Sequence, residues 1–284
     1  MLLFGQHSSS RGNFMNKTEY LCPLCQQMLI YQSKHLLCKN QHNFDCAKEG
    51  YVNLHPVQYK HSKNPGDNKA MVNARRAFLD KGFYRPLVEK LTLLYQSMGD
   101  ITMPVLDAGC GEGYYTHQHK KTQNKVYGVD IAKNAIRLAA KRYKTCFFSV
   151  GTLSQLPFKN EYFSWIYSIY APILEEEFTR VLKKGGYFVT VTPAENHLLE
   201  LKSLIYREVK KHNTNKKPVS QLNLVQEHRL NYTMSFQNSD DLLNLLSMTP
   251  FAFKTTTALL SELKNKKNFN CQADFLIRIY QRNS

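Results

Sequence analysis

The sequence predicts an α/β fold, in which a mostly parallel, Rossmann-like sheet follows a small metal-binding β module. Three observations lead to this prediction. Between residues 103 and 193, short apolar segments alternate with helical patterns, as parallel strands joined by crossover helices do. A glycine-rich turn comes directly after the first of these segments. Four of the seven cysteines lie before residue 47, at spacings that favour a metal site over a disulfide framework.

The N-terminal third of the chain divides into three parts. Residues 1–15 are expected to be a disordered leader, with Met1 or Met15 as the start, and residues 16–47 a zinc-binding β module. Residues 48–98 are expected to form a basic connector, irregular over 47–65, and two helices. The helices should run from Asn68 to Gly82 and from Pro86 to Met98, because asparagine caps a helix start, glycine ends a helix and proline suits the first turn.

Residues 99–284 are assigned to the main domain. Strands are expected over residues 103–109, 125–130, 145–150, 162–172 and 185–193. Helices are expected between them over residues 114–120, 132–143 and 175–182. This order predicts a parallel sheet with right-handed crossovers. The remainder should hold a helix over 196–211, a polar loop or lid over 212–228, a helix over 240–248 capped by Asn238 or Ser239, and a last strand over 272–280.

The charge of the chain is large and unevenly distributed. The net charge is +16, which favours an anionic partner such as nucleic acid over a generally basic surface. Residues 48–90 carry nine Lys/Arg against four Asp/Glu and residues 202–230 carry seven against two, whereas residues 91–201 carry twelve against ten. No apolar run reaches the roughly 18 residues of a membrane span, and no secretory signal precedes the module. We therefore expect a cytoplasmic protein with no membrane partner.

Four of the N-terminal residues have the spacing of zinc ligands. Cys22, Cys25, Cys38 and His42 form the pattern C-x2-C-x12-C-x3-H. Zinc prefers four tetrahedral sulfur or nitrogen ligands, and two short knuckles supply them in pairs. Since all four positions are filled by protein, the predicted site is structural. Cys46 is a further thiol nearby, and we interpret it as a bystander.

The glycine-rich turn predicts an S-adenosylmethionine site. Its spacing is G-x-G-x-G, whereas a dinucleotide site has G-x-G-x-x-G, and Tyr114 occupies the place of the last glycine. Asp107 ends the strand before the turn, where a carboxylate suits an amino-bearing ligand. Asp130 ends the next strand, where it can accept both ribose hydroxyls. A structural turn without ligand and a nicotinamide site are the alternatives. The turn residues are Gly109, Gly111, Glu112 and Gly113.

Other candidates lie at the carboxyl ends of the later strands, where open α/β sheets bind ligands. Residues 151–156 are expected to meet the adenine through backbone groups, with Leu156 beginning an apolar wall. Tyr170 and His197 follow the fourth and fifth strands, and either is a candidate to act on the methyl acceptor. His197 is also a candidate for contact with the polar end of the cofactor, and the alternative is a surface residue at the N-terminus of a helix. Tyr84 is interpreted by default as a core aromatic.

Taken together, the motifs CPLC…CKNQH, AKEGYVNL, PGDN…ARRAFLDKG, LDAGCGEGYYT, IYAP and TPAENHLLELK resemble those of the 23S rRNA guanine-N1-methyltransferases, from about residue 19 to the C-terminus. The resemblance implies a class I methyltransferase fold and methylation of a guanine in a hairpin loop that lines the ribosomal exit tunnel. It also implies a homodimer whose zinc modules frame an RNA cleft. The cofactor contacts of the family would fall on Tyr84, Gly111, Glu112 and His197.

RNA contacts are expected from the basic connector and the helix after it, because lysine and arginine bind phosphate and tyrosine rings stack on bases. The alternative is a solvated helix face with packed aromatic residues. The predicted contacts are Lys48, Tyr51, Tyr59, Lys60, Lys63, Arg75 and Arg76.

Two other functions fit parts of the sequence. A small-molecule methyltransferase would share the main domain, but it explains neither the zinc module nor the excess of positive charge. A non-catalytic zinc-containing RNA-binding protein would be expected to have an impaired cofactor turn, yet Asp107, Gly111 and Asp130 are all present.

Overall fold

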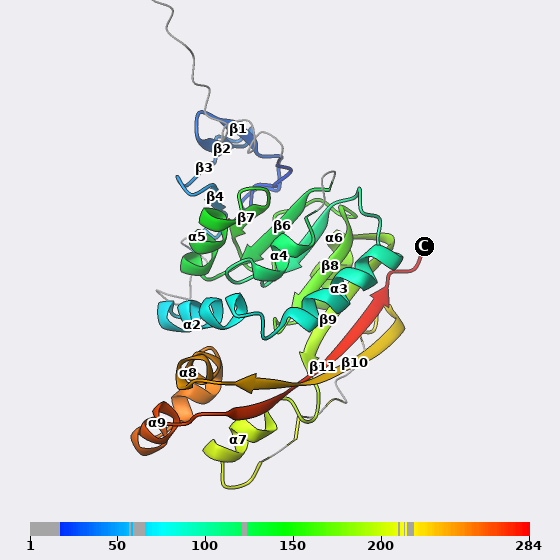
Figure 1. The fold of residues 1–284 in the computed structure, drawn as a ribbon. Coiled ribbons are helices and arrows are strands. Elements are labelled where there is room, and N and C mark those ends of the chain that lie inside the picture. The colour runs from blue at the N-terminus through cyan, green and yellow to red at the C-terminus, as the bar shows by residue number, and fades with distance from the viewer. Residues whose placement is uncertain are drawn as a thin grey trace, which may run out of the picture.

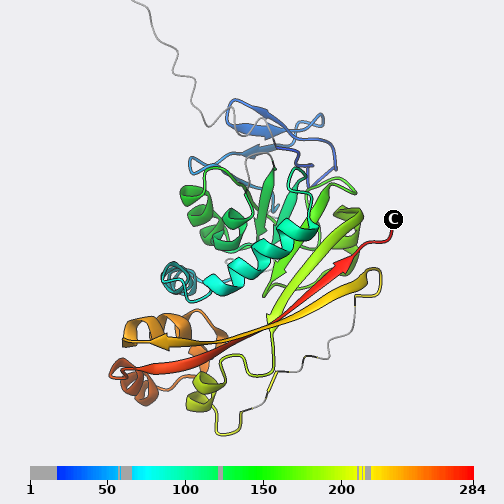
Figure 2. The ribbon, with the colours of Figure 1, turned by 45° about the vertical axis from the view of Figure 1, so that its right-hand side comes forward.

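The computed structural model describes residues 18–56, 58, 66–120, 124–209, 211–212, 214 and 219–284. Three parts follow one another from top to bottom in Figure 1: the N-terminal module, a large twisted sheet with helices, and a small C-terminal lobe. Figure 2 shows the long β10–β11 ribbon running from the sheet down into that lobe. No helix in the described part of the chain combines the length and the apolar character needed to cross a membrane.

The N-terminal module is a three-stranded antiparallel sheet that packs on the main domain. Its strands are β1 (Ile30–Gln32), β2 (His35–Leu37) and β3 (Asn43–Asp45). Just before them, Tyr20 is fully buried with its ring edge-to-face on Tyr127 at 5.5 Å, and Lys125 pairs with Glu19 at 2.6 Å. The aromatic contact removes apolar surface from water, so the module is anchored chiefly by burial.

The large sheet has eight strands in the order β10-β11-β9-β8-β5-β6-β7-β4. The five predicted strands are confirmed as β5 (Val105–Ala108), β6 (Val126–Asp130), β7 (Phe147–Val150), β8 (Phe163–Ile169) and β9 (Leu182–Pro193), all parallel to their neighbours within this group. The predicted last strand is β11 (Phe269–Gln281), which is antiparallel to β9. Apolar runs such as VLDA and FFSV are buried on both faces, as expected when helices cover a parallel sheet.

Most predicted helices are also confirmed. Asn68 caps α2 by accepting a hydrogen bond from the N–H of Met71, and Asn238 caps α8 in the same way. The helices are α2 (Lys69–Asp80), α3 (Arg85–Met98), α4 (Tyr114–Gln118), α5 (Lys133–Arg142), α6 (Glu175–Val181), α7 (Leu199–Ile205), α8 (Ser239–Ser247) and α9 (Thr257–Lys264), with the 3-10 helix η2 (Pro250–Lys254) between the last two.

Three expectations were wrong. The connector is not irregular throughout, because β4 (Tyr51–Asn53) joins the edge of the large sheet beside β7. The helix expected over 196–211 is restricted to α7. The loop expected over 212–228 gives way at residue 223 to β10 (Asn223–Phe236), which pairs with β11 along its whole length. Residues 223–227 of β10 are exposed on both faces and give no strand pattern. From residue 229 the sequence RLNYTMSF does alternate polar and apolar residues, and this strand signal was missed.

The order of the strands fixes the position of a ligand crevice. The chain moves outward from β5 through β6 to β7, then returns to the other side of β5 for β8 and β9. The carboxyl ends of β5 and β8 therefore bound a topological switch point, where open α/β sheets bind ligands. In Figures 1 and 2 these ends face the small lobe that contains α7 and α8.

Candidate active site and metal centre

The four predicted metal ligands lie together. Their ligand atoms are within 4.8 Å of one another. The Nδ1 atom of His42 is 3.4 Å from the Sγ atoms of Cys22 and Cys38, and the Sγ atoms of Cys25 and Cys38 are 3.6 Å apart. Tetrahedral zinc with bonds of about 2.0–2.3 Å places its ligand atoms about 3.5–3.8 Å apart, so this set fits zinc. Four protein ligands leave no position for a reacting group, and the site is structural.

Cys46 takes no part in this cluster. The backbone of Cys46 instead forms an antiparallel bridge with Val52, which connects the module to β4. Burial raises the pKa of the Cys46 thiol to about 12. The prediction that this cysteine is a bystander is therefore confirmed.

The three glycines of the turn after β5 have different surroundings. All three have positive φ angles, of +80° for Gly109, +55° for Gly111 and +83° for Gly113. A Cβ atom on Gly109 would collide with the side chain of Ala171, and one on Gly113 would lie 2.9 Å from the Cβ of Ala139. A Cβ atom on Gly111 would meet only Nη1 of Arg75, at 3.8 Å. Among the described residues, Gly111 is therefore bordered on this side by the flexible end of Arg75 alone, so it is the turn glycine with most room for a ligand beside the backbone.

Three carboxylates surround that turn. Oδ2 of Asp130 accepts the N–H of Gly111 at 2.9 Å, so the end of β6 braces the turn. Asp107 is 1% exposed and accepts a hydrogen bond from Oγ1 of Thr116 at 2.6 Å. Among the described residues Oε1 of Glu112 has no hydrogen-bond partner, although the side chain is buried. Burial raises the pKa of Asp107 and of Glu112 to about 7. Such acids favour a ligand that brings hydrogen-bond donors or positive charge.

Tyr84, Tyr170 and His197 form a cluster beside the turn. Nε2 of His197 lies 3.0 Å from the hydroxyl oxygen of Tyr170 and 3.5 Å from that of Tyr84. The ring of Phe275 packs 5.0 Å from both Tyr84 and His197. Tyr170 has a φ of +57°, which a non-glycine residue adopts only where its surroundings hold it. The structure thus brings together residues that lie up to 113 positions apart in the sequence.

Leu156 does not line this crevice, so the prediction that it does was wrong. Its side chain is fully buried, its N–H donates to Oε1 of Glu177, and its carbonyl accepts from Arg180 at 3.0 Å. Its backbone is therefore occupied by α6, and its side chain belongs to the core below the N-terminal module. Leu153, in the same loop after β7, lies nearer the glycine turn: its side chain would be 3.9 Å from a Cβ atom at Gly109.

The connector residues predicted to contact RNA differ in their surroundings. Lys48 is exposed at the start of the connector. Tyr51 is 5% exposed within β4 and packs in the main core, so its ring has no free face for a base and the RNA contact predicted for it was wrong. Tyr59, Lys60 and Lys63 lie outside the described residues.

The two arginines of α2 point in different directions. Arg75 forms an ion pair with Asp67 and donates to the carbonyl of Met248 at 3.3 Å, and its guanidinium lies beside Gly111 in the glycine turn. Arg76 lies 4.0 Å from Asp80 and remains partly exposed. The Arg75 side chain thus links α2, the end of α8 and the turn, whereas Arg76 lies nearer the outer surface.

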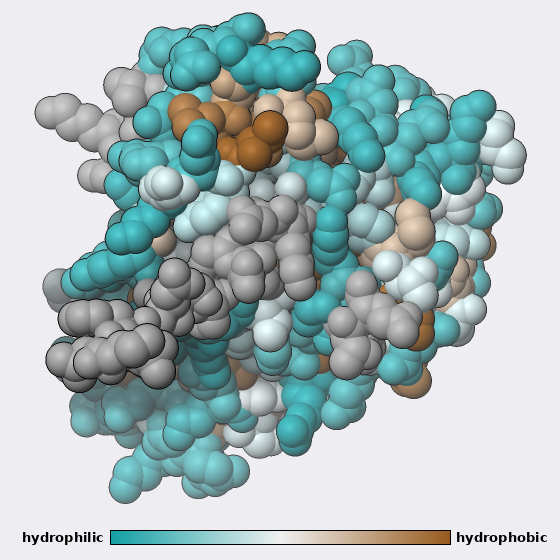
Figure 3. Space-filling view, turned by 90° about the horizontal axis from the view of Figure 1, so that it is seen from above, coloured by the Kyte–Doolittle hydropathy of each residue, from teal (hydrophilic) through white to brown (hydrophobic). Residues whose placement is uncertain are grey.

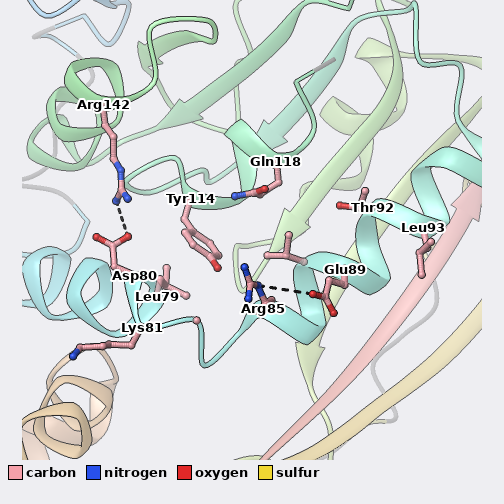
Figure 4. A pocket seen from close by; sticks show the side chains of 12 residues that line it. Leu79, Asp80, Lys81, Arg85, Glu89, Thr92, Leu93, Tyr114, Gln118 and Arg142 are labelled. Atoms are coloured by element: carbon pink, nitrogen blue, oxygen red, sulfur yellow. Dashed lines mark hydrogen bonds and ion pairs between the residues drawn. The ribbon is translucent and has the colours of Figure 1, made fainter. Parts of the chain in front are cut away.

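A separate pocket opens between α2, α3 and the start of α4 (Figure 4). Lys81, Arg85 and Arg142 line it, but Arg142 pairs with Asp80 at 2.7 Å and Arg85 lies 3.9 Å from Glu89. Its cations are thus largely balanced by carboxylates. None of the predicted cofactor residues lines the pocket, so we do not assign the cofactor to it.

Sequence reasoning missed the residues that support His197 from behind. Asp274 on β11 bonds to the loop that carries His197, and Arg229 on β10 forms an ion pair with Asp274. These residues lie in two strands paired across 45 positions of sequence. The sequence shows Asp274 as a single acid within an apolar strand, but this pattern does not indicate which residues it contacts.

The N-terminal module and the main domain each match a known protein family. A family model described as "RlmA, N-terminal" matches residues 20–63, and a model described as "Methyltransferase domain" matches residues 100–247. The chain is 33% identical over 192 residues to the "23S rRNA (guanine(748)-N(1))-methyltransferase" of Streptomyces fradiae, covering 66% of this chain and 68% of that protein. It is 28% identical over 277 residues to the Bacillus subtilis (strain 168) protein named "Putative 23S rRNA (guanine-N(1)-)-methyltransferase YxjB", covering 92% of this chain and 96% of that protein.

Proposed function

This chain belongs to the family of 23S rRNA (guanine-N1)-methyltransferases, and we propose that it transfers the methyl group of S-adenosylmethionine to N1 of a guanine in a 23S rRNA hairpin loop. The observation that carries this proposal is the crevice between β5 and β8. At these strand ends lie Gly111 with room beside its backbone, the buried acids of the same turn, and the Tyr170–His197 pair that follows β8 and β9.

We propose that different residues at these strand ends bind different parts of the cofactor. Each carboxylate oxygen of Asp130 accepts one backbone N–H, from Gly111 on Oδ2 and from Ala132 on Oδ1, and keeps a lone pair for a ribose hydroxyl. Asp107 and Glu112 would hold the amino-bearing end, since a buried carboxylate gains most from a cationic partner. Tyr84 and His197 would close that end from the side of β11. When bound, the cofactor supplies an electrophilic methyl group on a positively charged sulfur.

The target guanine must lose its N1 proton during the transfer. Burial lowers the pKa of His197 to about 3, and it raises the pKa of Tyr170 well above its usual value. Neither group is therefore an effective base near neutral pH. We propose that the proton goes to water, and that the site contributes mainly by positioning the base for in-line attack.

The RNA would approach a broadly basic surface. The net charge of +16 attracts the phosphate backbone, and Lys48 and Arg76 are exposed or partly exposed cations that can contact it. Contacts by Lys60 and Lys63 remain predictions.

We propose that two copies form a homodimer, as the family resemblance implies. Three apolar residues of the N-terminal module are exposed: Leu24 by 39%, Met28 by 42% and Ile30 by 63%. Figure 3 shows a brown, hydrophobic area on the face of the molecule seen from above. Contact with a second copy would remove such apolar surface from water. We propose that the activity takes place in the cytoplasm, because its proposed substrate is ribosomal RNA.

The affinity for S-adenosylhomocysteine should rise about tenfold between pH 6 and pH 8. Asp107 and Glu112 both have a pKa of about 7, so each is mostly neutral at pH 6 and charged at pH 8, and only a charged carboxylate pairs with the ligand ammonium. Isothermal titration at the two pH values measures this change. The Thr116→Val variant loses the hydrogen bond that lowers the pKa of Asp107, so its rise should move to higher pH. An affinity that stays level or falls over this range would argue against the Asp107 assignment.

Methyl transfer to isolated ribosomal RNA tests the substrate class. We expect label from S-adenosylmethionine in 23S rRNA and none in 16S rRNA. The RNA affinity should decrease steeply with added salt, because each phosphate contact releases a counterion. Reverse transcription should stop at one hairpin-loop guanine, since a methyl group on N1 blocks base pairing. Label that enters a small-molecule extract instead would favour the small-molecule alternative.

A further inference from the structure

Asp274 holds the loop that carries His197 at three points. Its carbonyl accepts the N–H of Ala194 at 2.9 Å, and its Oδ2 accepts the N–H of Asn196 at 3.0 Å. Its own N–H donates to Nδ1 of His197 at 3.2 Å. The next residue, Leu198, has a φ of +56°, a strained conformation for leucine. These bonds fix both the path of the loop and the plane of the imidazole.

Arg229 holds the carboxylate of Asp274 in turn. Its Nε and Nη2 atoms donate to Oδ1 and Oδ2 at 2.8 and 2.7 Å, a bidentate pair. The Asp274 side chain is 0% exposed and that of Arg229 is 48% exposed, so the guanidinium reaches a buried carboxylate from the surface. Burial alone would raise the pKa of Asp274, but hydrogen bonds from Arg229 and Asn196 lower it below its usual value. Without Arg229 a buried charge would be left unpaired.

The same contacts decide where His197 carries its proton. A backbone N–H can only donate, so Nδ1 of His197 must be the bare, accepting nitrogen. Burial keeps the ring neutral at physiological pH, because it lowers the pKa of His197 to about 3. The single ring proton therefore lies on Nε2, which faces the tyrosine hydroxyls.

This tautomer sets the direction of the Tyr170 hydroxyl. Because Nε2–H donates to the Tyr170 oxygen at 3.0 Å, the hydroxyl proton of Tyr170 is not used in that contact. Tyr170 follows the carboxyl end of β8 and is 46% exposed as a residue, with its hydroxyl at the more buried end, so this proton is left for a group that enters beside the ring. The chain thus offers a hydrogen-bond donor where the methyl acceptor would lie.

We propose that Asp274 and Arg229 are positioning residues that fix His197 as an Nε2–H donor and so direct the Tyr170 hydroxyl toward O6 of the target guanine. This inference rests on the proposed function. During transfer N1 gains the methyl group, the carbon–sulfur bond breaks with its electron pair left on sulfur, and the N1 proton goes to water. Negative charge grows on O6 as that proton leaves, and a preorganised donor stabilises it.

The test combines imidazole 15N NMR of the resting enzyme with steady-state kinetics. We expect the wild-type His197 ring to be neutral and protonated on Nε2 between pH 6 and pH 8. Arg229→Ala and Asp274→Asn keep the backbone N–H of residue 274 but weaken the side-chain bonds that hold the loop, so the ring can leave that N–H. Both should therefore mix the two tautomers and lower kcat about tenfold or more, with KM for RNA changed less than about threefold. Arg229→Lys should recover part of kcat, since it restores the charge without the bidentate geometry. The melting temperature of each variant is measured to identify loss of fold.

A second ion pair on the same ribbon provides the matched control. Nε of Arg278 donates to Glu227 at 2.7 Å, and neither residue bonds to the loop of His197. Arg278→Ala should therefore leave the tautomer and kcat unchanged. A wild-type ring protonated on Nδ1, or variants at Arg229 and Asp274 that behave like Arg278→Ala, would overturn the inference. The NMR result does not require methyl transfer, so failure of the inference is distinguishable from failure of the proposed function.

Discussion

Replacing Gly111 with arginine is expected to abolish binding of S-adenosylmethionine and to reduce methyl transfer below detection. Among the described residues, a Cβ atom on Gly111 would meet Arg75 alone, at 3.8 Å, so a long side chain would enter the space assigned to the cofactor. The φ of +55° adds backbone strain of about 1–2 kcal/mol for a residue with a Cβ, which a domain of ordinary stability tolerates. Fold and RNA binding should therefore persist.

Gly185 provides the matched control for this variant. It has a φ of +71° and no atom within 4 Å of its Cβ position, so Gly185→Arg imposes similar strain at the amino-terminal part of β9, far along the chain from the turn. Titration with S-adenosylhomocysteine and a methyl-transfer assay compare the two proteins. If Gly111→Arg retains cofactor binding, or if Gly185→Arg loses it equally, the position assigned to the cofactor is incorrect.

Replacing Cys22 with serine is expected to remove zinc and to unfold the N-terminal module. A structural zinc site contributes an apparent binding free energy of roughly 10–16 kcal/mol in small modules, and such modules do not fold without the metal. The three short strands β1 to β3 offer little core of their own. Metal content should fall below one zinc per chain, and RNA affinity should drop at least tenfold, which filter binding would show.

Cys46 is the matched control for zinc removal, because it is a cysteine of the same module that lies outside the ligand cluster. Cys46→Ser should keep one zinc per chain. Cofactor affinity should stay near wild type in both variants, since the turn at Gly111 belongs to the main domain. Unchanged zinc content in Cys22→Ser would contradict the ligand set, and a loss of zinc in Cys46→Ser would show that the set is incomplete.

The parts of the fold that sequence reasoning predicted are those governed by local chemistry. Strands β5 to β9 are apolar runs bounded by turns, and the caps at Asn68 and Asn238 are side-chain properties, so each is visible in a short window of sequence. The cysteine spacing likewise encodes the zinc ligands, because a tetrahedral ion constrains residues close together in the chain.

The parts that were not predicted depend on contacts between distant residues. β4 is a strand because β7 offers it an edge, and the exposed first residues of β10 are in a strand because β11 pairs with them. Leu156 looked like a cleft residue because it follows β7, yet Glu177 and Arg180 engage its backbone from α6. The roles of Asp274 and Arg229 likewise became visible only once β10 and β11 were paired.

One measurement tests the central claim most directly. Total ribosomal RNA from cells that lack the gene is incubated with the purified protein and S-adenosylmethionine carrying a labelled methyl group, and the RNA is then digested to nucleosides. The account predicts label in 1-methylguanosine derived from large-subunit RNA. Label in another nucleoside, or RNA without label although the protein binds the cofactor, would contradict it.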